Sequence, residues 1–233
     1  VQKNIGAVNA MAFDISAACS GFVFGMSIAD KFIKTGAFKN ALVIGSEVLS
    51  KHVNWADRST CVLFGDGSGG AFIERSKKPG VIAEDVMSDG AKGFALTDAR
   101  CTPSNVFNDV KKVESVEDIK IRMDGKEIFD FATRRIPKSI KKLMEENNIT
   151  ADDIKYIVPH QANERIVKFI AKKLKMPVEK FYLNIYEYGN TSSASIPIAL
   201  NEMFEKNLLE EGDKIIISGF GGGLTWGSML IEI

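Results

Sequence analysis

The sequence contains few of the residues that build metal centres and disulfide frameworks. Its 233 residues include three cysteines and two histidines. Cys19, Cys61 and Cys101 are widely spaced, which fits neither a disulfide framework nor a metal cluster and is typical of a reducing compartment. We therefore expect no metal site and a cytoplasmic location.

The chain also lacks net charge and long apolar runs. Its 30 basic side chains balance its 30 acidic ones, so we expect no nucleic-acid partner, because non-specific binding to nucleic acid needs an excess of Lys and Arg. No apolar run approaches the roughly 18 residues of a membrane helix, and we expect no membrane partner. We expect no secretory signal, and we expect Val1 to be an internal residue of a longer protein.

The rest of the composition, with 45% hydrophobic and 26% charged residues, is that of a globular protein. Short apolar runs alternate with helical stripes, which predicts an α/β fold. We expect strands at residues 12–15, 41–44, 70–73, 155–158, 214–217 and 228–231. We expect helices along residues 22–33, 128–140 and 166–174 and from about Ser195, with a kink at Pro137.

Two parts of the chain repeat one order of elements. Cys19 precedes a helix, a strand that ends at Gly45, a Gly-rich turn and another strand; Asn190 precedes the same series, with Gly219 in the place of Gly45. A duplicated α/β unit explains this order, although any α/β protein shows some of it. We predict one unit over residues 1–88, a connecting surface segment over 89–124 and a second unit over 125–233.

Cys19 is the first candidate for chemistry. It lies among small residues where a strand is expected to meet a helix. Unpaired N–H groups at a helix N-terminus stabilise a thiolate, so we expect the pKa of Cys19 to lie below its usual value of about 8.5. The alternative is a buried, inert cysteine, which is common for this residue type.

Polar residues of the second unit supply further candidates. His160 follows an apolar strand, and ligands of open α/β sheets bind beyond the carboxyl ends of strands. Asn190 takes the place of Cys19 in the repeat. The alternatives are a packed core histidine and a turn or capping asparagine. The run Gly221–Gly223 can turn N–H groups toward a ligand oxygen, as an oxyanion hole requires, whereas Gly65–Gly70 lacks the Lys-Ser/Thr of a nucleotide loop.

Five motifs, taken in order, resemble those of the β-ketoacyl-[acyl-carrier-protein] synthase III family of thiolase-like condensing enzymes. They are Ala17–Phe22, Phe64–Gly67, Pro159–Asn163, Tyr188–Ser195 and Phe220–Ser228. Each motif is weak alone, but the ordered set is specific and spans nearly the whole chain. The resemblance implies a five-layered αβαβα sandwich of two duplicated halves, with the N-terminal half incomplete here, and a homodimer.

The resemblance further implies an acyltransferase that initiates fatty-acid synthesis by a decarboxylating Claisen condensation. Cys19 would take an acyl group from an acyl-CoA, with the backbone N–H groups of Cys19 and Gly222 as the oxyanion hole. His160 and Asn190 would donate hydrogen bonds to malonyl-acyl-carrier-protein as carbon dioxide leaves, and the carbanion would attack acyl-Cys19. Both thioesters are substrates, so no cofactor is expected.

Binding roles also follow from the resemblance. The positions that match contacts to coenzyme A, the pantetheine tunnel and the acyl pocket are Leu49, Arg58, Gly125, Phe129, Ala162, Asn163 and Phe220. For the apolar ones, plain core packing is the alternative.

Basic residues recur on the helix after His160. Arg165, Lys168, Lys172 and Lys175 follow one another at steps of three, four and three, and Lys173 flanks them. A local basic face on a neutral protein fits an acidic partner such as acyl carrier protein. We predict that this partner docks on Gln161, Arg165, Lys168, Lys172 and Lys173; the alternative is a solvated helix face.

Two other functions stay open at this point. A specialised relative would make a polyketide or a signalling molecule, and pocket residues would decide between it and the fatty-acid enzyme. The other hypothesis is that the chain is a non-catalytic fragment, which needs a further N-terminal portion.

Overall fold

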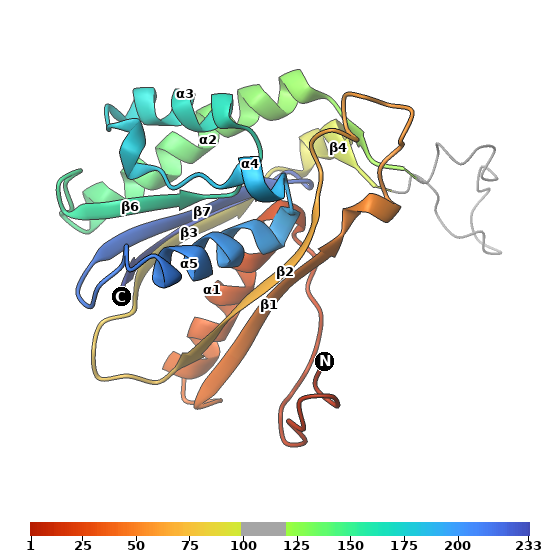
Figure 1. The fold of residues 1–233 in the computed structure, drawn as a ribbon. Helices are drawn as coiled ribbons and strands as arrows, with labels where there is room; N and C mark the ends of the chain where they lie inside the picture. Colours follow the sequence, from red (N-terminus) through yellow and green to blue (C-terminus); the bar gives the residue numbers. More distant parts are fainter. Residues whose placement is uncertain (99–119) are drawn as a thin grey trace.

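The computed structural model describes residues 1–98 and 120–233, which form stacked layers of helix and sheet (Figure 1). The helices are α1 (Gly21–Lys34), α2 (Gly125–Glu146), α3 (Glu164–Leu174), α4 (Ile185–Tyr188) and α5 (Ser195–Glu205). The strands are β1 (Asn40–Val48), β2 (Asp66–Glu74), β3 (Val81–Ser88), β4 (Leu96–Thr97), β5 (Arg122–Met123), β6 (Ile154–Pro159), β7 (Lys214–Gly221) and β8 (Thr225–Glu232). Short 3-10 turns are η1 (Ala18–Ser20), η2 (Leu49–Lys51), η3 (Gly90–Ala95), η5 (Val178–Lys180) and η6 (Ser192–Ala194).

The largest sheet has the strand order β3-β8-β7-β6. Strands β6 and β7 are parallel, whereas β8 is antiparallel to both β7 and β3. The apolar run Ile215–Ile217 of β7 is almost fully buried, as expected for a strand covered on both faces. Strands β1 and β2 form a separate antiparallel pair, and β4 and β5 form a small one.

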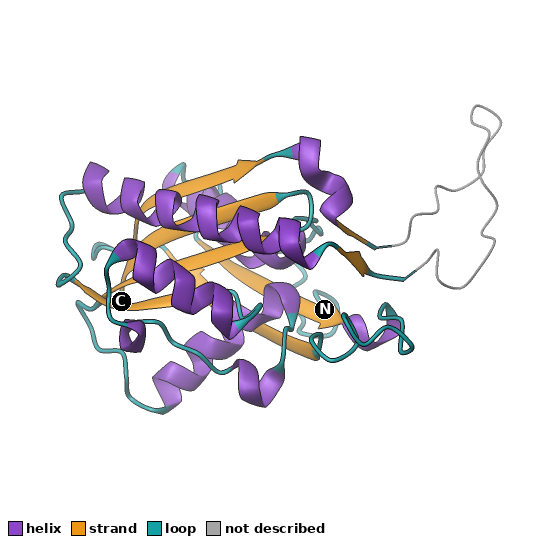
Figure 2. Cartoon of the chain, turned by 90° about the horizontal axis from the view of Figure 1, so that it is seen from above, coloured by secondary structure: helices purple, strands orange, loops and turns teal. Residues whose placement is uncertain are grey.

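Helices cover both faces of the large sheet (Figures 1 and 2). On one face α2 packs over β7 and β8, and α3 packs against α2 within the same hydrophobic core. On the other face α1 and α5 lie between this sheet and the β1–β2 pair. The described residues therefore make four successive layers, αβαβ, of the five that we expect. Among these residues no helix covers the outer face of β1–β2, where Leu42, Ile44 and Phe72 are exposed.

The structure contains the predicted repeat as two series of elements in the same order. The series η1-α1-β1-β2 recurs as η6-α5-β7-β8, and both strand pairs are antiparallel. The turns η1 and η6 both begin with a residue in the left-handed region, which is Ala18 at φ 45° in η1 and Ser192 at φ 51° in η6. When η1 and η6 are matched, Ser193 corresponds to Cys19. The predicted correspondence of Asn190 with Cys19 is therefore wrong by three residues.

Two predictions about strands were wrong. Residues 12–15 form no strand, and Phe13 and Ile15 are exposed. Strand β3 was missed because charged residues interrupt its apolar pattern, and it pairs with β8. The boundary predicted after residue 88 therefore falls one strand too late, since β3 belongs to the second sheet.

Two smaller expectations concern α2 and the connecting segment. Helix α2 contains the buried Pro137 in its interior, and the kink expected at this residue stays a prediction. Within the predicted connecting segment 89–124, the structure has η3, β4 and β5. Residues 99–119, including Cys101, lie outside the described part of the chain.

Candidate active site

Cys19 is the middle residue of the turn η1, two positions before the first residue of α1, and it is 6% exposed. The following residue anchors this turn, because Ser20 Oγ donates to the carbonyl of Ala17 at 2.7 Å and lies 2.6 Å from Thr225 Oγ1. Thr225 Oγ1 also lies 3.0 Å from the Ala17 carbonyl oxygen. The cysteine turn is thereby attached to the start of β8.

The acidity of the thiol differs from the sequence prediction. Burial raises the pKa of Cys19 to about 11, although a hydrogen bond with the Ser192 side chain favours the thiolate. The nearby carboxylate of Glu47 raises the pKa further. Desolvation of the charged form thus outweighs the helix N-terminus that we expected to lower this pKa. The thiol carries its proton at neutral pH in the free protein.

The glycine run at the end of β7 lies directly against the cysteine. A Cβ atom on Gly221 would lie 2.8 Å from Cys19 Cβ and 3.1 Å from its Sγ. The next residue, Gly222, faces the same turn, with its would-be Cβ 3.4 Å from Ala18 Cβ. Backbone at this position can approach a substrate held on Cys19 only because no side chain occupies the space.

Asn190 is held by the segment before β2. Its N–H donates to the carbonyl of Leu63 at 2.8 Å, and its carbonyl accepts from the N–H of Gly65 at 2.9 Å. Its side-chain Oδ1 accepts from the N–H of Ser192 at 2.9 Å. The motif Phe64–Gly67 therefore supports Asn190. It does not form a phosphate loop.

His160 follows β6 and is 1% exposed. Its Nδ1 lies 2.7 Å from Ser195 Oγ, the backbone of Ser192 also hydrogen-bonds the ring, and Phe220 meets the ring edge to face at 5.4 Å between centroids. Burial lowers the pKa of His160 to about 3. The imidazole is therefore neutral at physiological pH.

One residue connects the three candidates. Ser192 contacts Cys19 through its side chain, His160 through its backbone and Asn190 through its N–H. Turns η1 and η6 also contact each other. The structure thus brings together three residues that are far apart in sequence. Ser192 was not among the predicted site residues, because a small polar residue within a motif carries no separate signal.

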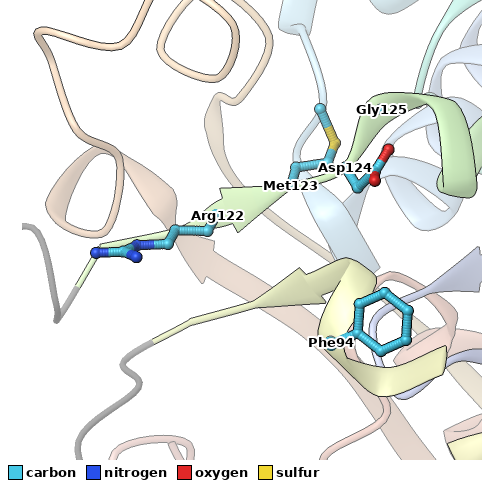
Figure 3. Close-up of a pocket in the computed structure, with 5 residues that line it drawn as sticks. All are labelled: Phe94, Arg122, Met123, Asp124 and Gly125. Atoms are coloured by element: carbon cyan, nitrogen blue, oxygen red, sulfur yellow. The ribbon is translucent and has the colours of Figure 1, made fainter. Parts of the chain in front are cut away.

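The predicted binding residues are more dispersed. Gly125 lines a cavity of about 520 Å³, shown in Figure 3, together with Phe94, Arg122, Met123 and Asp124. Phe220 contacts His160, and Phe129 packs edge to face on Phe169 at 5.6 Å. Leu49 is half-buried in η2, Arg58 is exposed in the loop before β2, and Ala162 is half-buried before α3. Asn163 caps α3, its Oδ1 accepting from the N–H of Arg165 at 2.8 Å.

Gln161 was wrongly assigned to the docking surface. It is 1% exposed, and its amide donates to the carbonyls of Pro159 at 2.9 Å and Tyr182 at 3.1 Å. Its Oε1 also accepts from the N–H of Asn184. The buried Gln161 links, through these hydrogen bonds, the segments that follow β6 and η5, and it cannot contact a partner protein.

The other predicted docking residues are exposed on α3. They are Arg165, Lys168, Lys172 and Lys173. Lys168 pairs with Glu164 at 2.6 Å, and the Lys173 ammonium lies 5.3 Å from the centre of the Phe169 ring. The face therefore stays basic but carries one acidic residue.

Within residues 1–98 and 120–233, no group of three or more His, Cys, Asp or Glu side chains is placed to hold a metal ion. None of the helices described there is long and apolar enough to span a membrane.

Comparison with known proteins gives consistent results. The family pattern described as 3-oxoacyl-[acyl-carrier-protein] synthase III matches residues 13–90, and the pattern for the C-terminal part of that family matches residues 144–233. The β-ketoacyl-[acyl-carrier-protein] synthase III of Clostridium novyi is 52% identical over all of this chain and 71% of its own length. That of Clostridium acetobutylicum is 49% identical over 70% of its length.

A solved structure agrees with these sequence matches. The crystal structure of 3-oxoacyl-[acyl-carrier-protein] synthase III from Aquifex aeolicus superposes with a TM-score of 0.90 at 41% identity, covering all of this chain and 70% of that one. The thiolase-like fold class is therefore confirmed.

Proposed function

The chain belongs to the β-ketoacyl-[acyl-carrier-protein] synthase III family, and we propose that it performs the family reaction with Cys19, His160 and Asn190 as its catalytic residues. It is an acyltransferase that condenses an acyl-CoA with malonyl-acyl-carrier-protein and so initiates fatty-acid synthesis. The observation that carries the residue assignment is the convergence of the three side chains on Ser192.

The first half-reaction loads Cys19. Its sulfur attacks the thioester carbonyl of the acyl-CoA, the carbon–sulfur bond to coenzyme A breaks, and the thiol proton leaves with the coenzyme A sulfur. The carbonyl oxygen becomes an oxyanion in between, and the N–H groups of Cys19 and Gly222 are the proposed donors to it. Because burial raises the pKa of the free thiol to about 11, Cys19 meets its substrate as the protonated thiol at neutral pH and loses the proton during loading.

The second half-reaction uses His160 and Asn190. Malonyl-acyl-carrier-protein loses carbon dioxide, and the electrons of the broken bond form an enolate on its thioester. Neutral donors at the enolate oxygen stabilise this charge, and the low pKa of His160 keeps its ring neutral. The enolate carbon then attacks acyl-Cys19, and the 3-ketoacyl-carrier-protein leaves as the Cys19 sulfur is released.

Donation by His160 sets a condition on its tautomer. For Nε2 to carry the proton, Nδ1 has to be the acceptor in its 2.7 Å contact with Ser195 Oγ. The hydroxyl of Ser195 then donates to the ring, although it also lies 2.8 Å from the carbonyl of Ser192. Ser195 has one proton, so its orientation selects the tautomer.

The partners follow from the same reaction. Coenzyme A thioesters and acyl carrier protein are its substrates, and we propose that the carrier protein docks on Arg165, Lys168, Lys172 and Lys173 of α3. We further propose a homodimer, a cytoplasmic location and a reaction without metal or other cofactor. Sedimentation of the purified protein tests the dimer: a species of a single chain's mass would contradict it.

Single substitutions test which half-reaction each catalytic residue serves. His160→Ala and Asn190→Ala should retain acylation of Cys19 by acetyl-CoA but lose decarboxylation of malonyl-carrier protein by about 10²–10³-fold, the usual cost of one oxyanion donor. Cys19→Ala should lose acylation entirely. Equal loss of both half-reactions in all three variants, with their folds intact, would mean that the assigned roles are wrong.

A further inference from the structure

Glu47 belongs to β1 in the first half of the molecule but binds the turn η6 in the second half. Its Oε1 accepts a hydrogen bond from Ser193 Oγ at 2.6 Å and a longer one from the Ser193 backbone N at 3.3 Å. One carboxylate oxygen therefore fixes both the side chain and the backbone of a single residue. Hydrogen bonds to charged acceptors are the stronger ones in proteins.

The strand places Glu47 on the face that meets η6. A Cβ atom on Gly45 would lie 2.7 Å from the Ser193 carbonyl oxygen and 2.9 Å from the Ala194 nitrogen. Gly45 and Glu47 share one face of β1 because side chains alternate along a strand. The η6 backbone thus rests on Gly45, and the Glu47 side chain reaches the same turn two residues further on.

The turn that Glu47 holds is strained. Ser192 has φ 51°, a left-handed conformation that costs free energy in a residue with a side chain and persists where the surroundings impose it. Ser192 is also the residue that contacts both Cys19 and His160. The contact of Glu47 with Ser193 lies one residue away from this junction.

We propose that Glu47 is a positioning residue, which holds η6 through Ser193 so that Ser192 contacts Cys19 and His160 together. This inference rests on the catalytic roles proposed above for those two residues. Glu47 touches neither substrate nor the reacting atoms in this arrangement. Without it, η6 is released from β1, and the strained Ser192 is free to relax away from the cysteine turn.

The charge of Glu47 gives an independent argument for this role. The carboxylate raises the pKa of the Cys19 thiol, so its charge opposes formation of the nucleophile. Its contribution to the reaction therefore lies in the hydrogen bonds that it accepts. A neutral side chain of the same shape should preserve that contribution.

A set of variants separates anchoring from charge. Glu47→Ala removes both, Glu47→Gln keeps an acceptor oxygen at the same reach, and Ser193→Ala removes the stronger of the two donors. Ser46→Ala is the matched control, because Ser46 is the exposed neighbour on the opposite face of β1. Thermal unfolding of each variant reports whether it folds, and Glu47→Asp, with its shorter reach, replaces Glu47→Ala if that variant does not.

The primary measurements are the rate of Cys19 acylation by acetyl-CoA, followed by peptide mass spectrometry, and the rate of condensation. We expect Glu47→Ala to lower both by about 10²-fold, the scale of an ångström-sized misplacement. Ser46→Ala should retain the wild-type rates, and Glu47→Gln should match or exceed them, because it keeps the acceptor and removes the charge that raises the pKa of Cys19. The double variant with Ser193→Ala should lose no more than Glu47→Ala alone, since residues acting through one contact are not additive.

Several outcomes would overturn the proposal. They are wild-type rates in Glu47→Ala, equal losses in Glu47→Gln and Glu47→Ala, and additive losses in the double variant. If the wild-type protein itself transfers no acyl group, the proposed function fails separately. The positioning role of Glu47 is then tested by the rate at which iodoacetamide alkylates Cys19. Glu47→Ala should react faster than Glu47→Gln, because both variants lack the charge but only Glu47→Ala exposes the thiol. Equal alkylation rates would refute the positioning role.

Discussion

Gly221 is the residue whose substitution tests the packing of the site most sharply. A Cβ atom there would lie 2.8 Å from Cys19 Cβ, 2.9 Å from its backbone N and 3.1 Å from its Sγ, whereas ordinary contact begins at 3.4 Å. The two nearest of these atoms, Cβ and the backbone N of Cys19, are fixed to the turn and cannot rotate away as Sγ can. Gly221→Ala therefore has to move β7 and η1 apart by more than half an ångström.

The expected effect is larger on the reaction than on stability. Overpacking of this kind costs about 1–3 kcal/mol of unfolding free energy, whereas a displacement near one ångström at reacting groups costs about 10²-fold in rate. We expect Gly221→Ala to fold, to unfold at a lower temperature, and to acylate Cys19 about 10²-fold more slowly. Gly80→Ala is the control, because no atom lies within 4 Å of its would-be Cβ.

The assay follows acetyl transfer to Cys19 over time by peptide mass spectrometry, alongside thermal unfolding of the same samples. Acylation of Gly221→Ala at the wild-type rate would refute the close contact between β7 and the cysteine turn. A similar loss in Gly80→Ala would show that the effect is not specific to the site.

Three further predictions concern pH and charge. The rate of Cys19 alkylation by iodoacetamide should keep rising through pH 10, because burial raises the pKa of this thiol to about 11; a plateau near pH 8.5, where a free thiol titrates, would contradict the burial. His160 has a folded pKa of about 3 against an ordinary 6.5, so the unfolded chain binds the extra proton between these values. The unfolding free energy should therefore fall as the pH drops from 6.5 toward 3, by at most about 1.4 kcal/mol per pH unit, and His160→Gln should lose this component in denaturant titrations. Arg165→Glu should raise the Michaelis constant for malonyl-carrier protein and leave acetyl-CoA loading unchanged; an equal effect on loading would exclude α3 as the docking face.

The order of most helices and strands could be predicted from sequence, because it depends on local patterns. The motifs of the family resemblance indicated Cys19, His160 and Asn190, and the structure brings these three residues together around Ser192. Apolar periodicity located α1 and β7. The thiol pKa could not be predicted in this way. It depends on desolvation, and the residues that bury Cys19, such as Gly221, come from the other half of the chain.

Two wrong predictions have the same cause. Gln161 looked like a surface residue because it is polar and precedes a basic helix, but three backbone partners satisfy its amide in the interior. Strand β3 was not predicted, because Glu84 and Asp85 break its apolar run. Both acids are paired with lysines, Glu84 with Lys31 and Asp85 with Lys142, and such partners lie too far away in sequence for a local pattern to show them.

Mass spectrometry after incubation with acetyl-CoA decides whether Cys19 is the nucleophile of this acyltransferase. We expect one acetyl group per chain, located on the peptide that carries Cys19, absent from Cys19→Ser and removed on addition of malonyl-carrier protein. An unmodified wild-type protein, or an acetyl group that persists in Cys19→Ser, would rule out Cys19 as the nucleophile.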